Sequence, residues 1–159
     1  MELTFAPKGR LQIDDARLVY KNFRGEGGKY NREGDRNFAV VIPNEEMAEE
    51  LKQEGWNVKI KEPKEAGDMP FMYLPVKIKF REYGPNVYLI SGQRRNRITE
   101  ETVAMLDNIE IANADLDIRP YDWEVSGSTG RTAYLEAMEV TQNIDRFAQR
   151  YAEEEYPEE

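Results

Sequence analysis

The most restrictive feature of this 159-residue chain is its regular alternation of apolar and polar residues. In residues 72–80 every second side chain is apolar, from Met72 to Phe80, and Lys77 and Lys79 stand between them. Successive side chains of a strand point to opposite faces, so a period of two indicates a strand with one buried face. The pattern recurs along the chain and favours a mainly β fold.

Alternation and short apolar runs predict seven strands, separated by segments rich in glycine, proline and asparagine. The predicted strands span 11–23, 36–42, 58–61, 72–80, 87–90, 109–125 and 131–142. Residues 44–54 should form a short helix with Asn44 as its N-cap, and residues 99–106 a second one. Loops or turns are expected at 24–35, 83–86 (a hairpin turn), 93–97 and 126–130.

The predicted elements fit a single domain with one core. Strands joined by hairpins, with two short peripheral helices, favour a five-stranded Greek-key barrel of the OB-fold type. We expect this domain to span 1–150. Residues 151–159 should form a disordered acidic tail, because clustered like charges repel one another.

Composition narrows the functional classes. The chain has no cysteine and no histidine, which excludes disulfides, thiolate or histidine metal sites and the usual catalytic triads. We therefore expect a binding protein without catalytic residues, metal or cofactor. The first residues lack the pattern of a signal peptide, and no apolar run approaches the roughly 20 residues that span a bilayer. These features predict a soluble protein, without membrane contact, in the cytoplasm.

The net charge of −9 is distributed unevenly along the chain. Residues 76–97 carry 6 basic and 1 acidic side chains, whereas residues 98–124 carry 1 basic and 8 acidic ones. A polyanion can approach a cationic face while acidic segments point elsewhere. The overall acidity therefore does not exclude binding to nucleic acid.

Two basic stretches also carry aromatic residues, a mixture that suits single-stranded DNA. Cations follow the phosphates, and rings offer stacking platforms worth about 1–3 kcal/mol per base. The candidate residues of the first stretch are Arg17, Tyr20, Lys21, Phe23, Arg24, Lys29, Tyr30, Arg32 and Arg36. Glycines should keep the loop 24–35 of this stretch adaptable. Those of the second are Lys77, Lys79, Arg81, Tyr83, Tyr88, Arg94, Arg95 and Arg97, which Lys59 and Lys61 are candidates to extend.

Simpler explanations exist for both stretches. The aromatics of the first can belong to the core, and lysines of the second can protect an edge strand from aggregation. Trp56, Tyr73, Tyr121 and Trp123 are expected in the core. The carboxylates of 98–124 favour a solvated acidic face over a magnesium site; they are Asp107, Glu110, Asp115, Asp117, Asp122 and Glu124.

Five segments resemble bacteriophage and prophage single-stranded DNA-binding proteins, and the likeness covers most of residues 11–150. The segments are 16–23, 25–38, 72–77, 117–123 and 130–135. The resemblance implies an OB-fold that coats single strands during phage replication or recombination in a bacterial host cell, without strong sequence preference.

It also implies that the acidic tail recruits replication or recombination proteins or competes with DNA. The tail residues are Glu153, Glu154, Glu155, Tyr156, Glu158 and Glu159. Bacterial relatives end on a hydrophobic residue, whereas this chain ends on Glu159. Self-association into a homo-oligomer is compatible with the sequence. The alternatives are an acidic protein-interaction module that mimics DNA and, less favoured, a magnesium-dependent nuclease.

Overall fold

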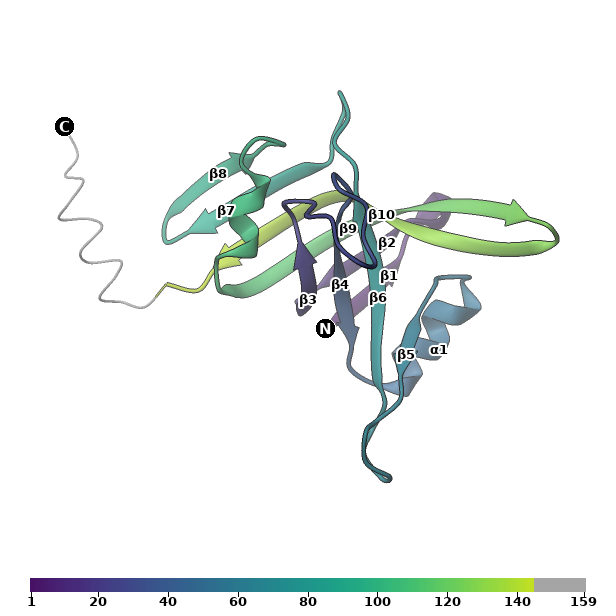
Figure 1. The fold of residues 1–159 in the computed structure, drawn as a ribbon. Helices are drawn as coiled ribbons and strands as arrows, with labels where there is room; N and C mark the ends of the chain where they lie inside the picture. The colour runs from purple at the N-terminus through teal and green to yellow at the C-terminus, as the bar shows by residue number, and fades with distance from the viewer. Residues whose placement is uncertain (145–159) are drawn as a thin grey trace, which may run out of the picture.

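The computed structural model describes residues 1–144, which form a mainly β fold (Figure 1). Its strands are β1 (Glu2–Phe5), β2 (Leu11–Asp14), β3 (Leu18–Asn22), β4 (Arg36–Ile42), β5 (Lys59–Lys61), β6 (Phe71–Ile78), β7 (Asn86–Ser91), β8 (Arg94–Ile98), β9 (Ile111–Val125) and β10 (Ser128–Gln142). The helices are the 3-10 helix η1 (Pro7–Gly9), the α-helix α1 (Glu45–Gln53) and the 3-10 helix η2 (Val103–Asp107). The predicted fold class is confirmed, whereas the tail at 151–159 lies outside the described residues.

The strand pairing closes a barrel. β3 pairs with β4, β4 with β6, and β6 and then β7 run parallel to β10. β10 pairs with β9, and β9 pairs with β2. β2 and β3 are consecutive in the chain, so the circuit closes through the chain itself.

Closure takes place at Ala16 and Arg17. The Ala16 N–H donates to the carbonyl oxygen of Ala114 in β9 at 2.8 Å, and the Arg17 carbonyl accepts from Val41 in β4 at 3.0 Å. The curved segment 11–22 therefore serves as one barrel strand shared by two neighbours. Together with β4, β6–β7, β9 and β10 it makes the five-stranded Greek-key barrel of an OB-fold, to which β1, β5 and β8 are added.

The helix expected over 99–106 is the shorter 3-10 helix η2, and the turn expected over 126–130 is limited to 126–127, because β10 begins at Ser128. Three further local predictions, all about the course of strands, were wrong. The strand expected over 11–23 breaks at Asp15, whose φ is 55°, because the two halves pair with different strands. Residues 83–86 do not form a hairpin turn, since β6 and β7 run in the same direction along β10. The expected basic loop at 93–97 is largely strand β8, paired antiparallel with β7.

The core lies inside the barrel and is built from the alternating apolar residues. The largest fully buried side chains include Leu11, Ile13, Phe23, Phe38, Leu74, Leu116 and Ile118. On α1, Ala48 and Leu51 are buried, and the Asn44 side chain accepts from the Met47 N–H at 2.8 Å as the predicted N-cap. Among residues 1–144, none of the helices has the length and the apolar composition of a membrane span.

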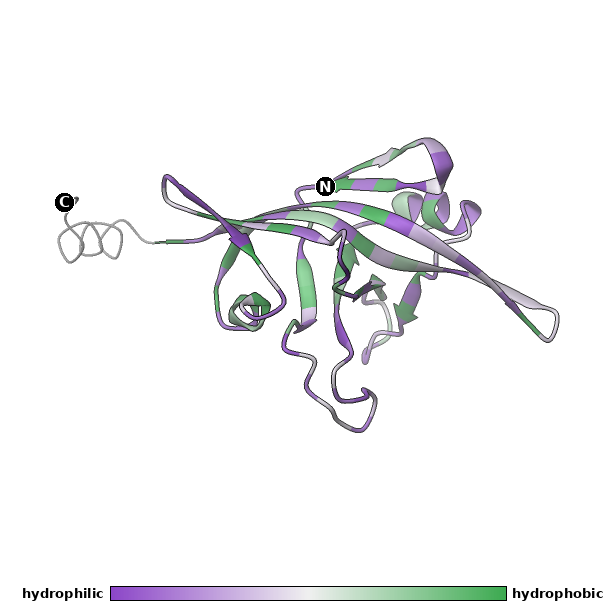
Figure 2. Ribbon diagram, turned by 90° about the horizontal axis from the view of Figure 1, so that it is seen from above, coloured by the Kyte–Doolittle hydropathy of each residue, from purple (hydrophilic) through white to green (hydrophobic). Residues whose placement is uncertain are grey.

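β9 and β10 extend beyond the barrel as a two-stranded arm, defined here as residues 121–132 (Figures 1 and 2). The register pairs Tyr121 with Thr132 and continues to Val125 with Ser128. At its base the arm touches the segment after α1 through a bridge between Trp56 and Arg131. Its side chains are mostly exposed, in contrast to the barrel part of both strands.

Candidate nucleic-acid interface

A groove of about 560 Å³ lies on the outer surface of β4 and β6, bordered by the loop 23–35. Six of the residues expected to bind nucleic acid line it, and they come from both basic stretches. They are Tyr20, Tyr30, Arg32, Arg36, Lys77 and Lys79. Folding therefore brings parts of the two stretches, far apart in the sequence, to one site. Tyr73 and Tyr134 complete its aromatic lining.

Strand register explains why these side chains meet. Along β6 the even-numbered residues from Met72 to Ile78 are buried, so the odd-numbered ones face outward. Lys77 is paired with Asn37 of β4 on one side and with Tyr134 of β10 on the other. Paired residues project from the same face of a sheet. A cation thus stands between an amide and an aromatic ring on three adjacent strands.

Tyr20 is held in an unusual position at one end of the groove. It lies at an irregularity in the β3–β4 pairing, with a φ of 51°. Its ring makes edge contacts with Tyr73, at 5.3 Å between centroids, and with Phe71, at 6.1 Å, yet the residue is 55 % exposed. Left-handed backbone at a non-glycine residue is costly and often marks a ligand site. The result is an exposed ring fixed at a defined angle.

β5 adds cations beside this aromatic group. Lys59 pairs with Tyr73 and Lys61 pairs with Phe71. Both lysines are exposed, and the register places them on the outward face of β6. They therefore extend the cationic surface along the sheet beyond the groove.

The arm continues the aromatic lining in the other direction. The Arg119 guanidinium lies 4.7 Å from the ring centroid of Tyr134, and the rings of Tyr134 and Tyr121 meet edge to face at 6.0 Å. Trp123 follows on the same face and covers Gly130, where any Cβ would collide with its ring. Tyr121 and Trp123, at 55 % and 38 % exposed, are not core residues.

Tyr73, Tyr121 and Trp123 were thus wrongly expected in the core, whereas Trp56 is buried as predicted. The sequence does contain a signal for the arm, because Arg119, Tyr121 and Trp123 alternate with period two. That spacing gives one cationic and two aromatic side chains on a single face.

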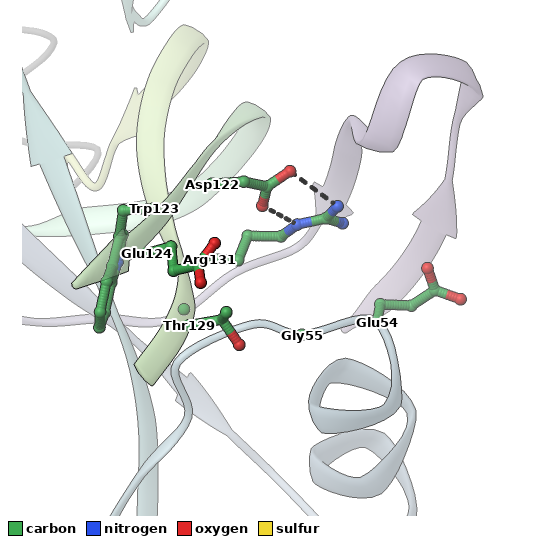
Figure 3. A pocket seen from close by; sticks show the side chains of 8 residues that line it. Glu54, Gly55, Asp122, Trp123, Glu124, Thr129 and Arg131 are labelled. Atoms are coloured by element: carbon green, nitrogen blue, oxygen red, sulfur yellow. Dashed lines mark hydrogen bonds and ion pairs between the residues drawn. The ribbon is translucent and has the colours of Figure 1, made fainter. Parts of the chain in front are cut away.

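The opposite face of the arm has different chemistry (Figure 3). Arg131 donates from Nε and a terminal nitrogen to the Asp122 carboxylate at 2.7 and 3.2 Å, and this pairing lowers the pKa of Asp122 below its ordinary value. The same guanidinium lies 5.4 Å from the ring centroid of Trp56. Glu54 and Glu124 line the pocket beside this pair. The acidic character of this face makes it unsuitable for a polyanion.

Several candidates of the first stretch have structural partners instead. Phe23 is fully buried and stacks on Phe38 at 5.4 Å, so it is a core residue and not a stacking platform. The Lys21 ammonium donates to the carbonyl oxygens of Leu106 and Ile109 at 3.0 and 3.1 Å. These contacts, with the pairing of Arg24 and Asp107 at 3.2 Å, attach the start of the loop to η2.

The remaining candidates are spread over three places. Lys29 lies beside Tyr30, at 5.4 Å from its ring centroid. Arg17 is exposed and lines a separate pocket with Lys21 and Ile109. Arg81 and Tyr83 stand on the exposed turn between β6 and β7.

The β7–β8 hairpin forms a second cationic cluster. The Arg95 guanidinium lies 3.8 Å from the ring centroid of Tyr88, and that of Arg97 lies at 6.0 Å. Arg95 also pairs with Glu139 at 3.7 Å, and Arg97 donates to Asn86 at 2.8 Å. Arg94, the remaining cation of the hairpin, is exposed. The second stretch is therefore divided between the groove and this hairpin.

The carboxylates of 98–124 are dispersed over η2 and β9. Asp107 accepts from the backbone N–H groups of Phe23 and Arg24, and Asp115 from that of Asp15. Partial desolvation of the exposed Asp117 side chain, and then the charges of Glu136 and Asp14, raise its pKa. Within residues 1–144 no three acidic side chains gather in an arrangement that could hold a metal ion.

Comparison with solved structures identifies the fold. The single-stranded DNA-binding protein from bacteriophage Enc34 aligns with a TM-score of 0.56 at 12 % identity, over 92 % of this chain and 93 % of that one. Its structure in complex with ssDNA aligns with a TM-score of 0.55 at 14 % identity, over 91 % and 93 %. No curated protein matches the chain by sequence.

The family assignment comes from the sequence itself. A family model described as "Putative phage ssDNA-binding domain" matches residues 2–159. This match extends over nearly the whole chain and confirms the resemblance found in its segments. The chain belongs to the family of phage ssDNA-binding domains.

Proposed function

We propose that the protein is a non-catalytic single-stranded DNA-binding protein, which binds the DNA in the groove on β4 and β6. The observation that carries this proposal is the convergence of Tyr20, Tyr73 and Tyr134 with Lys77 and Lys79. Aromatic rings and cations in one groove supply the two interactions that bind single-stranded DNA, which are base stacking and phosphate neutralisation. The Enc34 protein, solved with ssDNA, has the same fold and supports this reading.

The path of the DNA follows from the placement of the aromatic rings. The DNA enters at the rings of Tyr20, Tyr73 and Phe71, which Lys59 and Lys61 flank. It then crosses Lys77 to Tyr134 and leaves along Tyr121 and Trp123 on the arm. Every base presents a face for stacking, so binding of this kind has little sequence preference. The cluster of Tyr88, Arg94, Arg95 and Arg97 serves as a secondary contact for phosphates.

The biological setting that we propose is phage replication or recombination in the cytoplasm of a bacterial host. Residues 153–159 supply the acidic tail, which recruits replication or recombination proteins or competes with DNA for the cationic surface. Self-association along the strand is compatible with this role.

Titration with oligo-dT tests the proposal. We expect tight binding at about 50 mM salt, weak binding to duplex, and a steep loss of affinity between about 50 and 200 mM salt, because phosphate contacts release counterions. Trp123 should report binding through quenching, since Trp56 is buried. A complete lack of binding at the lower salt concentration would refute the proposal.

The same titration tests the first alternative, because a DNA mimic should bind no oligonucleotide. A separate incubation of labelled DNA with magnesium tests the second. A nuclease should degrade the DNA, whereas the proposed protein leaves it intact.

A further inference from the structure

The loop 23–35 borders the groove, and the Asn31 side chain makes four of the hydrogen bonds that fix it. The Asn22 side chain adds two more, both to the backbone of Glu26. The amide nitrogen of Asn31 donates to the carbonyl oxygens of Glu26 (2.8 Å), Asp35 (3.0 Å) and Arg32 (3.2 Å), and its oxygen accepts from Asn37 (2.9 Å). Its backbone also bonds with Gly28, whose N–H donates to the Asn31 carbonyl at 2.8 Å. One half-buried side chain thus links both limbs of the loop to the start of β4.

Other contacts in the loop agree with a fixed conformation. Gly34 donates to the carbonyl of Gly25 at 2.8 Å, and Gly27 donates to the Glu33 carboxylate at 2.6 Å. Gly25 has a φ of 69°, and a Cβ there would lie 3.0 Å from the backbone of Gly34. The glycines therefore allow the two limbs to approach closely, and do not make the loop adaptable as the sequence suggested.

Tyr30 and Arg32, the two candidate DNA contacts that this loop contributes to the groove, flank Asn31 directly, and Asn31 itself also lines the groove. Tyr30 is 91 % exposed, and the ring contact described for it is with the neighbouring Lys29. Arg32 is also exposed. Because packing does not hold either side chain, the backbone on both sides of Asn31 determines where they stand.

We propose that Asn31 is a positioning residue, which holds Tyr30 and Arg32 at the groove before DNA arrives. This inference rests on the proposed function, because it assigns to Asn31 a share of the DNA affinity that acts through Tyr30 and Arg32, although Asn31 also lines the groove. Ordering a free loop on binding costs conformational entropy, which lowers affinity. A loop that is already ordered avoids this cost.

The test compares Asn31→Ala with Asn57→Ala. Asn57 is an exposed asparagine outside the groove and serves as the matched control. We expect Asn31→Ala to bind oligo-dT about ten-fold more weakly, as for the loss of a preordered segment, and Asn57→Ala to bind like the wild type. Hydrogen exchange at the Gly28 and Gly34 amides of the free protein should accelerate in Asn31→Ala alone.

Combination with Tyr30→Ala and Arg32→Ala distinguishes positioning from direct contact. If Asn31 acts through these residues, Tyr30→Ala and Arg32→Ala should each reduce oligo-dT affinity much less in the Asn31→Ala background than in the wild type. Equal losses in both backgrounds, or unchanged binding by Asn31→Ala, would overturn the inference. If the wild type itself fails to bind, the proposed function fails, while unchanged exchange in Asn31→Ala would separately refute the role of Asn31 in the loop.

Discussion

At the scale of single residues, the groove depends on side chains whose backbone is unusual. Tyr20 combines a left-handed φ with a ring that is half exposed and contacts Tyr73 at its edge. The sequence marked Tyr20 as a candidate because cations surround it. It could not show that the break in the β3–β4 register turns the ring toward β6, since that depends on a strand that begins 51 residues later, at Phe71.

Replacement of this ring should separate binding from stability. We expect Tyr20→Ala to weaken oligo-dT binding by about ten-fold, within the range of 1–3 kcal/mol for one stacked base. Tyr20→Phe keeps the ring and should bind nearly as well as the wild type. Fluorescence titration measures the affinities, and a urea melt should show little change for either variant. Equal weakening by both variants would contradict stacking.

Gly130 should determine the position of Trp123. Gly130→Ala places a Cβ in the space of the Trp123 ring, so the ring must move and become more exposed. We expect a red-shifted emission and stronger quenching by acrylamide. Gly28→Ala is the control, because a Cβ there meets no atom within 4 Å. An unchanged spectrum for Gly130→Ala would show that the ring does not cover this glycine.

At the scale of elements, alternation predicted most strands, and local signals predicted α1. The alternation did not predict which strands pair with one another. β6 and β7 look like a hairpin in sequence, since Gly84 and Pro85 are typical turn residues, yet both strands lie parallel to β10. The turn at 81–84 only interrupts a strand that continues in the same direction. The groove needs this arrangement, because it places Tyr134 of β10 beside Lys77.

α1 offers a test of stability that leaves the groove intact. Asn44 caps the helix through the Met47 N–H. We expect Asn44→Ala to lower the free energy of unfolding by about 1 kcal/mol, the usual value of such a cap. Urea denaturation measures this change, and oligo-dT affinity should stay the same. A loss of affinity would link α1 to the binding site.

β6 should supply a phosphate contact at Lys77. We expect Lys77→Ala to weaken binding to all sequences similarly and to reduce the salt slope of the binding constant by about 1. Lys52→Ala is the control, since Lys52 lies on α1 and pairs with Glu49 at 3.7 Å. The dependence of affinity on salt concentration checks both variants. An unchanged slope in Lys77→Ala would remove this residue from the path.

At the scale of the whole molecule, the acidic segment 98–124 meets the cationic groove at one point, because its Glu100 pairs with Arg36 at 3.7 Å. Asp107 and Asp122 of the acidic segment pair with Arg24 and Arg131, so part of its charge is compensated within the fold. The sequence predicted the segregation of charge but not these pairs. They join residues that are distant in the chain or that meet only in the register of the arm.

Asp117 should make stability depend on pH. Its pKa is raised in the folded protein by partial desolvation and by the charges of Glu136 and Asp14. A raised carboxyl pKa stabilises the fold below the unfolded value, and this contribution is lost as the pH rises through the folded one. We expect Asp117→Asn to melt at a higher temperature than the wild type at neutral pH, and the difference to vanish under acidic conditions. A lower melting temperature at neutral pH would contradict this assignment.

The arm determines more than the path of a strand. Five residue pairs, from Tyr121–Thr132 to Val125–Ser128, reach about 17 Å beyond the barrel at the usual rise per residue. A protein molecule bound as proposed would cover a longer stretch of DNA than its barrel alone would cover. The next molecule would have to pass the arm or stop before it. The length of this hairpin would then set the spacing between neighbours, and a shortened hairpin should pack more copies onto the same DNA.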